Sequence, residues 1–373
     1  MFTKFNLRDY NFKLFFTIIA ALIFGTVAVS SADSSYTQRQ IVGVIAGICV
    51  MIFVSFVNYD FIAKFYKLIW LVNIILLALV LVPGIGVNVN NATRWLLVGG
   101  ANGVQFQPSE FSKIFLIIFT AVYLDKHKSK EGINNFKCLA FLAVYLGAGL
   151  LLIVVEPDLS TTICITLIML TIIYVAGLSY KIIGIAMLVF IPCAGSFLWY
   201  IQNTEHRLLK DYQVNRILDF LYGKSDNLSQ QNNSIMAIGS GQLTGKGLNT
   251  STIATVKDAN FISEQQTDFI FSVIGEEVGF IGSVILIAII LFLVLQCIHI
   301  AREAKDLKGC LIVTGMAVLI AYQSFINIGV ATGVLPNTGI PLPFISYGQS
   351  SLLSVCAGMG IVLNVSIQRN KFD

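Results

Sequence analysis

Long runs of apolar residues recur along the whole chain and are separated mostly by short polar connections. Each run has about 17 to 22 residues, the length that an α-helix needs to cross roughly 30 Å of hydrocarbon. The pattern predicts ten transmembrane helices, at residues 14–32, 41–57, 68–83, 110–124, 138–154, 160–177, 182–200, 278–297, 311–332 and 350–367. The expected fold class is an all-α polytopic membrane protein with a large extracytoplasmic loop, 201–267, between the seventh and eighth helices.

Composition supports a membrane protein. Of the 373 residues, 56% are hydrophobic and only 12% are charged, which is too little polar surface to cover a soluble globule of this size. The pattern does not divide the chain, so residues 1–373 are expected to form one integral membrane domain that includes the loop 201–267. The net charge of +4 forms no basic patch, so no nucleic-acid partner is expected. The seven cysteines lie in or beside apolar runs and are interpreted as small hydrophobic residues.

The positive charges in the connections predict the orientation of the helices. With ten spans and a cytoplasmic N-terminus, the cytoplasmic segments hold 15 of the 24 Lys and Arg residues, the outer segments hold eight, and Lys113 lies within a span. Six of those eight lie in the loop 201–267, and long loops cross the membrane regardless of charge. Because Lys and Arg are enriched in short cytoplasmic loops, both termini are expected in the cytoplasm.

The outer connections contain most of the unusual residues. Pro108 and Ser109 predict a helix start with Ser109 as the N-cap, and Glu110 and Lys113 then share one face of the helix. This pair is either an ion pair at the membrane interface or part of a polar cavity. Lys113 lies a turn inside the span, which favours a cavity or a partner. Arg94, beside a tryptophan, is either a site residue or a membrane-interface anchor.

Three further outer stretches attract attention. In "EPDLST" (156–161), Asp158 is expected to cap the sixth span. The proline-rich stretch 336–343 cannot be helical and is expected to line a pocket, with Ser346 as a candidate polar contact. The loop 201–267 begins with a predicted amphipathic surface helix at 203–223 and continues into "SIMAIGSGQLTGKG", where Lys246 and free amides suit phosphate oxygens or form only a surface turn.

Five stretches together resemble the SEDS family of bacterial cell-wall polymerases, which includes RodA, FtsW and SpoVE. They are, in order, "RWLL" with "QPSEFSKIF", "EPDLST", "AIGSGQLTGKG", "TDFIFSVIGEEVGFIG" and "NIGVATGVLPNTGIPLPFISYG". The resemblance covers essentially the whole chain, and "GIPLP" with the short termini resembles RodA more than FtsW. It implies a ten-span glycosyltransferase of the bacterial cytoplasmic (inner) membrane that polymerises lipid II, an undecaprenyl-pyrophosphate disaccharide peptide, for cell elongation and shape. The implied protein partner is a class B penicillin-binding protein, which crosslinks the strands.

The resemblance also assigns residues. The aspartate of the "TDFIF" motif, required for activity in the family, is Asp268, and the matching arginine, glutamate and lysine are Arg94, Glu110 and Lys113. Asp268 is expected to act as general base toward a sugar hydroxyl, and the alternative is an N-cap of the eighth span. Arg94, Lys113, Arg216 and Lys246 are the candidates that hold the pyrophosphate leaving group.

Several alternatives stay open at the level of sequence. No organic cofactor is expected and no metal ligand is assigned, but a divalent cation, Mg or Mn, would suit a pyrophosphate. The chain could instead be a flippase that transports lipid II, a division polymerase like FtsW, or a scaffold that positions the transpeptidase. The concentration of polar features on the outer side favours the polymerase over the flippase.

Overall fold

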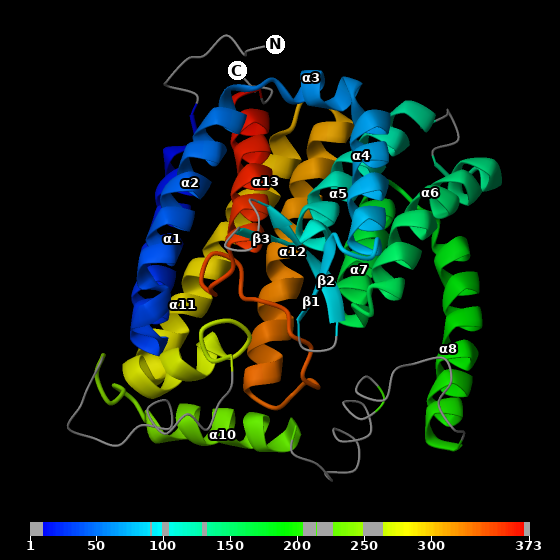
Figure 1. Ribbon diagram of the computed structural model, residues 1–373. Helices are drawn as coiled ribbons and strands as arrows, with labels where there is room; N and C mark the ends of the chain where they lie inside the picture. The colour runs from blue at the N-terminus through cyan, green and yellow to red at the C-terminus, as the bar shows by residue number, and fades with distance from the viewer. Residues whose placement is uncertain are drawn as a thin grey trace.

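Long helices that run roughly side by side make up most of the structure (Figure 1). The computed structural model describes residues 10–89, 92–98, 104–128, 133–203, 214, 227–248 and 264–368. Its elements are α1 (Phe12–Ala32), η2 (Ser34–Tyr36), α2 (Thr37–Phe56), α3 (Tyr59–Lys64), α4 (Tyr66–Val80), β1 (Gly86–Val89), β2 (Ala92–Val98), β3 (Val104–Phe106), α5 (Pro108–His127), α6 (Phe136–Val155), α7 (Leu159–Val175), α8 (Tyr180–Asn203), α10 (Asn227–Ser240), α11 (Ile270–Glu303), α12 (Leu307–Ala331) and α13 (Gln349–Ile367).

The prediction of a polytopic helical membrane protein is confirmed. Each of the ten predicted spans corresponds to a helix, namely α1, α2, α4, α5, α6, α7, α8, α11, α12 and α13. Within the described ranges, six helices are long and apolar enough to cross a membrane by themselves, and α4 and α7 are apolar but shorter. Helix α5 carries Glu110, Lys113, Asp125 and Lys126, so it is less apolar than its neighbours.

The bundle has an inner and an outer layer. Helices α5 and α12 lie inside, where α5 packs against α4, α7, α12 and α13, and α12 packs also against α11. Large apolar side chains such as Phe16, Phe53 and Phe280 remain exposed on the outer helices. A bilayer explains this exposure, because lipid is as apolar as the protein interior and such side chains gain nothing there by moving inside.

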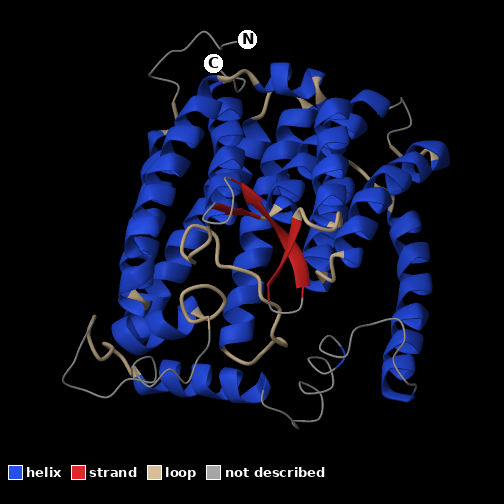
Figure 2. Cartoon of the chain, viewed as in Figure 1, coloured by secondary structure: helices blue, strands red, loops and turns tan. Residues whose placement is uncertain are grey.

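A small antiparallel sheet with strand order β1-β2-β3 lies among the helices (Figure 2). Strand β2 contacts α4 and α5, and β3 contacts α13. The sequence analysis did not predict these strands. They are only four, seven and three residues long, and their stability depends on pairing with one another and on the helix ends that they cover.

The residue that caps the start of α5 differs from the predicted one. Ser109 was expected to be the N-cap, but the N-cap is Gln107 and the helix begins at Pro108. Proline suits the first helical position, where its missing N–H would have no helical partner and its fixed φ is already helical. The hydroxyl of Ser109 instead accepts a hydrogen bond from the Gln107 side-chain amide, at 3.1 Å.

The two ends of the bundle carry different elements. Helix α3 lies at the end where α1 begins and α13 ends, and α10 lies across the opposite end (Figure 1). The sheet, the α6–α7 turn and the start of α11 belong to the half toward α10. The predicted surface helix at 203–223 lies almost entirely outside the described residues.

Candidate functional site

Asp268 lies in the turn that leads into α11, and its side chain is half-buried. Its backbone carbonyl accepts a hydrogen bond from Asn327 Nδ2 at 2.9 Å, and the same nitrogen donates to the carbonyl of Ile340 at 2.8 Å. The N-cap of α11 is Phe269, with no side-chain cap, so the alternative of Asp268 as an N-cap is wrong. The main chain of Asp268 is therefore fixed by Asn327, which also ties it to the segment that contains Ile340.

The proline-rich loop, residues 335–348, forms the wall beside Asp268. As predicted, it is non-helical, and its second half, residues 340–346, is largely buried. Gly339 has a φ of +72°, and a Cβ added to it would lie 3.4 Å from Asp268 Oδ2. The carboxylate thus lies directly against the loop backbone, where glycine supplies both the space and the left-handed conformation.

Ser346 ties the proline-rich loop to the turn before α11. Its hydroxyl accepts a hydrogen bond from the Leu342 N–H at 2.8 Å and donates to the carbonyl of Thr267 at 2.6 Å. The Tyr347 N–H also donates to the carbonyl of Gln266, at 2.9 Å. Ser346 therefore has a clear role in positioning Thr267 and Asp268, and its direct contact with a substrate stays a prediction.

Glu110 and Lys113 form a buried ion pair in the first turns of α5. Lys113 Nζ lies 2.8 Å from both carboxylate oxygens, and the two residues are 3% and 1% exposed. The helix start is anchored to α13, because the Gln107 N–H donates to Ser350 Oγ at 3.0 Å. Since α13 directly follows the proline-rich loop, the pair and the wall beside Asp268 are connected through adjoining elements.

Arg94 projects from β2 onto the turn between α6 and α7. Its Nε donates to the carbonyl of Glu156 at 3.3 Å, and its Nη2 donates to the carbonyl of Pro157. Its Nη1 lies 3.8 Å from Asp158 Oδ1, and its side chain is 23% exposed. Asp158 also caps α7 by accepting from the Thr161 N–H at 3.3 Å, which confirms its predicted capping role.

The Arg94–Asp158 pair lies near the Glu110–Lys113 pair. The charges of Lys113, Glu110 and Asp158 all act on the buried thiol of Cys164 in α7. The two pairs therefore surround one region between the starts of α5 and α7. With both cations and both anions ionised, the region is neutral.

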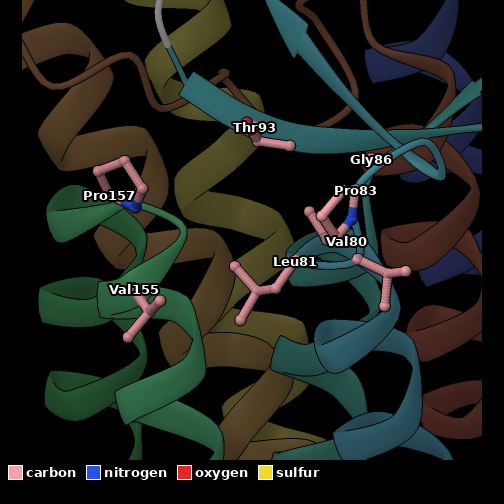
Figure 3. Close-up of a pocket in the computed structure, with 8 residues that line it drawn as sticks. Val80, Leu81, Pro83, Gly86, Thr93, Val155 and Pro157 are labelled. Carbon is pink, nitrogen blue, oxygen red and sulfur yellow. The ribbon is translucent and has the colours of Figure 1, made fainter.

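A pocket of about 280 Å³ adjoins Arg94 between the end of α4, the sheet and the α6–α7 turn. The residues that line it are Val80, Leu81, Val82, Pro83, Gly86, Thr93, Val155 and Pro157. Figure 3 shows Val155 and Pro157 on one side, the end of α4 on the other, and Thr93 of β2 along a third side. The pocket thus borders the turn that binds Arg94.

Lys246 lies in the glycine-rich segment, residues 239–247, and pairs with Glu276. Its Nζ is 2.7 Å from Glu276 Oε1, and Glu276 is buried. Glu277 accepts a hydrogen bond from the Ser31 hydroxyl at 2.6 Å, so both glutamates link neighbouring segments of the bundle. A role for Lys246 in holding phosphate stays a prediction, since this pairing gives it a structural contact.

Main-chain hydrogen bonds join the glycine-rich segment to a kink in α11. At Gly279 the helix has φ 69° and ψ −165°, so the regular helical hydrogen bonds are interrupted there. Four hydrogen bonds between the two segments replace them. In each, the backbone N–H of the first residue donates to the backbone carbonyl of the second: Lys246 to Glu276 at 3.0 Å, Gly247 to Glu277 at 2.9 Å, Phe280 to Gln242 at 2.8 Å and Ile281 to Leu243 at 3.1 Å. Irregular backbone at membrane depth is stable only where such partners exist.

Comparisons with known proteins agree with this geometry. The profile of the FtsW, RodA and SpoVE family, described as "Cell cycle protein", matches residues 10–371. The chain belongs to this family. Peptidoglycan glycosyltransferase MrdB of Escherichia coli K12 is 32% identical, with 94% of this chain and 92% of that protein covered. The probable peptidoglycan glycosyltransferase FtsW of Trichlorobacter lovleyi is 34% identical, with 97% and 94% covered.

Two solved structures resemble the fold closely. One, from work on coordinated polymerization and crosslinking by a peptidoglycan synthase complex, has a TM-score of 0.79 at 27% identity and covers 96% of this chain and 97% of its own. Thermus thermophilus RodA has a TM-score of 0.70 at 26% identity, with 97% and 98% covered. The expected membership of a family of cell-wall glycosyltransferases is confirmed. MrdB and FtsW proteins match about equally well, so the comparisons favour neither an elongation nor a division role.

Sequence reasoning located part of this site. Arg94 pairs with Asp158, Glu110 pairs with Lys113, and Asp268 lies beside Gly339. Arg216 lies outside the described residues. Two supporting residues were missed, Glu156 and Asn327. The available signal for both was a polar side chain at or within an apolar run, which marks a functional site by default. Among the described residues, no group of three or more His, Cys, Asp or Glu side chains gathers as a metal site.

Proposed function

We propose that this member of the FtsW, RodA and SpoVE family is a peptidoglycan glycosyltransferase that polymerises lipid II. The names of its relatives support the reaction class. The observation that carries the proposal is the placement of Asp268, whose main chain is fixed by Asn327 and whose carboxylate lies against Gly339. A base with a fixed position can take a proton from a bound hydroxyl without first reorganising.

In this proposal Asp268 accepts the proton of the attacking sugar hydroxyl. The hydroxyl oxygen forms a bond to the anomeric carbon of the donor, and the bond from that carbon to the pyrophosphate breaks. A single displacement needs one base and no second carboxylate as nucleophile, and it inverts the anomeric configuration. The pyrophosphate leaves with its electron pair as an anion.

Arg94 and Lys113 are the cations proposed to stabilise that anion. Arg94 is anchored by two backbone carbonyls and is partly exposed, so its charge is held in place and still accessible. Lys113 is buried against Glu110, which keeps it charged inside the bundle. Charges that are fixed before the reaction stabilise a developing anion more than charges that must move. Arg216, Lys246, Ser346 and a divalent cation remain further candidates.

The proposed setting is the bacterial cytoplasmic (inner) membrane, with catalysis on the outer face. Multiple apolar helices make the chain a multi-pass membrane protein. Lys and Arg are concentrated in the connections on the side of α3, which supports cytoplasmic termini. A relative in the peptidoglycan synthase complex supports a class B penicillin-binding protein as partner. The resemblance of "GIPLP" to RodA supports a role in elongation and cell shape.

A polymerisation assay tests this function. The purified chain, with and without a co-expressed class B penicillin-binding protein, is given labelled lipid II, and wild type is compared with Asp268→Asn. We expect polymer from wild type and none from the variant. The matched control is Glu264→Gln, which removes an exposed carboxylate four residues earlier and should polymerise normally.

Other outcomes would reject the proposal. Polymerisation by Asp268→Asn at the wild-type rate would show that the base is another residue. If the partnered wild type made no polymer, lipid II transport or a scaffold role would become the better explanation.

A further inference from the structure

Glu156 is a buried carboxyl group that the proposed reaction does not use. It is 0% exposed and follows the last residue of α6. Neither of its carboxylate oxygens has a hydrogen-bond partner in the structure. An ionised carboxylate in such a place is costly, because it has lost water and gained no donor in return.

Arg94 does not neutralise the Glu156 side chain, although it contacts the same residue. Its Nε and Nη2 donate to the backbone carbonyls of Glu156 and Pro157, and its Nη1 is directed at Asp158. The turn therefore holds the guanidinium by its main chain, while the Glu156 carboxylate oxygens receive no hydrogen bond from it. Burial, and then the nearby Asp158, raises the pKa of Glu156 to about 8, against a smaller lowering by Arg94.

Among the described residues, the charged groups that act on Glu156 are Arg94 of β2 and Asp158 at the start of α7. Glu110 and Lys113 of α5 act together with Asp158 on the neighbouring thiol of Cys164 in α7. The Arg94–Asp158 and Glu110–Lys113 pairs each sum to zero charge, so the charge on Glu156 decides whether the region is neutral or negative.

We propose that Glu156 is a positioning residue that holds a proton at neutral pH and so keeps Arg94 available to an anionic ligand. When Glu156 is neutral, Asp158 is the ionised carboxylate beside the guanidinium among the described residues. When it is ionised, a second negative charge beside Arg94 opposes the approach of a phosphate or pyrophosphate group. The identity of that ligand as the pyrophosphate of lipid II rests on the proposed function, but the protonation of Glu156 does not.

Infrared difference spectroscopy tests the protonation directly. Spectra of the full-length chain in detergent are recorded from pH 6 to pH 10 for wild type and Glu156→Gln. We expect the wild-type-minus-variant spectrum at pH 7 to contain the carbonyl stretch of a protonated carboxyl, and we expect that band to disappear by pH 10. The same subtraction with Glu264→Gln, an exposed acid, should contain no such band at pH 7. Absence of the band for Glu156 at pH 7 would overturn the proposal.

Ligand binding tests the effect on Arg94. Calorimetry with inorganic pyrophosphate is carried out at pH 7 and pH 9 on both proteins. One pH unit above a pKa, about a tenth of the carboxyl remains protonated, so wild-type affinity should fall by up to about tenfold more than that of Glu156→Gln. The change in protonation of pyrophosphate between pH 7 and pH 9 alters the affinity of both proteins equally, so it cancels when the two changes in affinity are compared. An equal fall in both proteins would reject the positioning role.

Polymerisation provides the third measurement. Glu156→Gln, which keeps shape and neutrality, should match wild type at pH 7 and lose the alkaline rise in KM for lipid II. An alkaline rise in KM as large as that of wild type would contradict the proposal. If wild type made no polymer at any pH, the proposed function would fail, and the infrared and pyrophosphate results would still decide the role of Glu156.

Discussion

Gly339 shapes the environment of Asp268 more closely than any other residue of the proline-rich loop. Gly339→Ala forces a side chain into a φ of +72° and places a methyl group 3.4 Å from Asp268 Oδ2. We expect polymerisation to fall by at least about tenfold, because a small displacement of a catalytic group is costly.

Gly177→Ala is the matched control for that substitution. Gly177 also has a positive φ, +104°, but a Cβ there meets nothing within 4 Å. Both variants should lose about 1 kcal/mol of stability from backbone strain, as measured by thermal unfolding in detergent. An equal loss of activity in both would mean that strain, and not the contact with Asp268, is responsible.

The Glu110–Lys113 pair is suited to a double-mutant cycle. Glu110→Gln or Lys113→Met alone leaves one buried charge without its partner, which should cost about 3 to 5 kcal/mol of unfolding free energy. The double variant should lose less unfolding free energy than the two single variants together, because no buried charge is left without its partner. All three should lose polymerisation if Lys113 stabilises the leaving group. Additive stability losses would contradict the strong coupling that the 2.8 Å contacts indicate.

Glu156 also predicts how stability depends on pH. Its ordinary pKa of 4.5 applies to the unfolded chain, and burial raises the folded value to about 8. Between these values the folded protein holds a proton that the unfolded chain has lost, so raising the pH favours unfolding. The melting temperature of wild type should therefore fall relative to that of Glu156→Gln from about pH 5 to pH 8 and then run parallel. A constant difference across this range would contradict the prediction.

The residues that the sequence could identify are those whose chemistry is unusual in their own segment. Asp268 and Lys113 are charges beside or inside apolar runs, and Arg94 lies in a recognisable motif. Gly339, Asn327 and Glu156 were not assigned roles because their roles depend on what lies opposite them. The sequence alone does not show whether a given Asp or Glu is buried or exposed, and only the packed structure distinguishes the two.

At the scale of elements, the glycine-rich segment and the kink in α11 form one unit. Gly241→Ala would bring a Cβ to 1.9 Å from the carbonyl oxygen of Gly275. The two backbones would have to separate, so we expect a loss of at least about 2 kcal/mol and weaker pairing of Lys246 with Glu276. Thermal unfolding of the variant in detergent measures the loss.

Gly239→Ala, two residues earlier, is the matched control. Gly239 lies in the last turn of α10, and a Cβ there meets nothing within 4 Å. Alanine in a helix is favoured over glycine, so stability should be unchanged or rise by up to about 1 kcal/mol. Equal destabilisation by the two substitutions would mean that the segment does not depend on close approach to α11.

Helices were far easier to predict than the irregular elements. Each span follows from one local property, its apolar length, and all ten were located within a few residues at most of their ends, apart from the longer α11. The sheet, the kink at Gly279 and the N-cap of α5 were missed or misplaced. Each of these depends on hydrogen bonds between segments that are distant in sequence or on competition between adjacent capping residues.

At the scale of the whole molecule, the proposed orientation can be measured by cysteine labelling. Met236→Cys in α10 and Lys64→Cys in α3 place exposed thiols at opposite ends of the bundle. A membrane-impermeant maleimide should label the first in intact cells and the second only after permeabilisation. The wild-type chain, with its own seven cysteines, provides the background. The reverse pattern would overturn the assignment of cytoplasmic termini.

The burial of α5 has a consequence for how the protein is made. Glu110 and Lys113 lie near one end of this helix and Asp125 and Lys126 near the other, and it packs against α4, α7, α12 and α13. A newly synthesised α5 that faced lipid alone would expose ionisable groups at a cost of a few kcal/mol each. Helices α12 and α13 are synthesised last. Until they are inserted, the surface of α5 that they cover in the folded protein has no helix packed against it. The architecture thus predicts that the polar flank of α5 becomes fully covered only after α12 and α13 have been inserted.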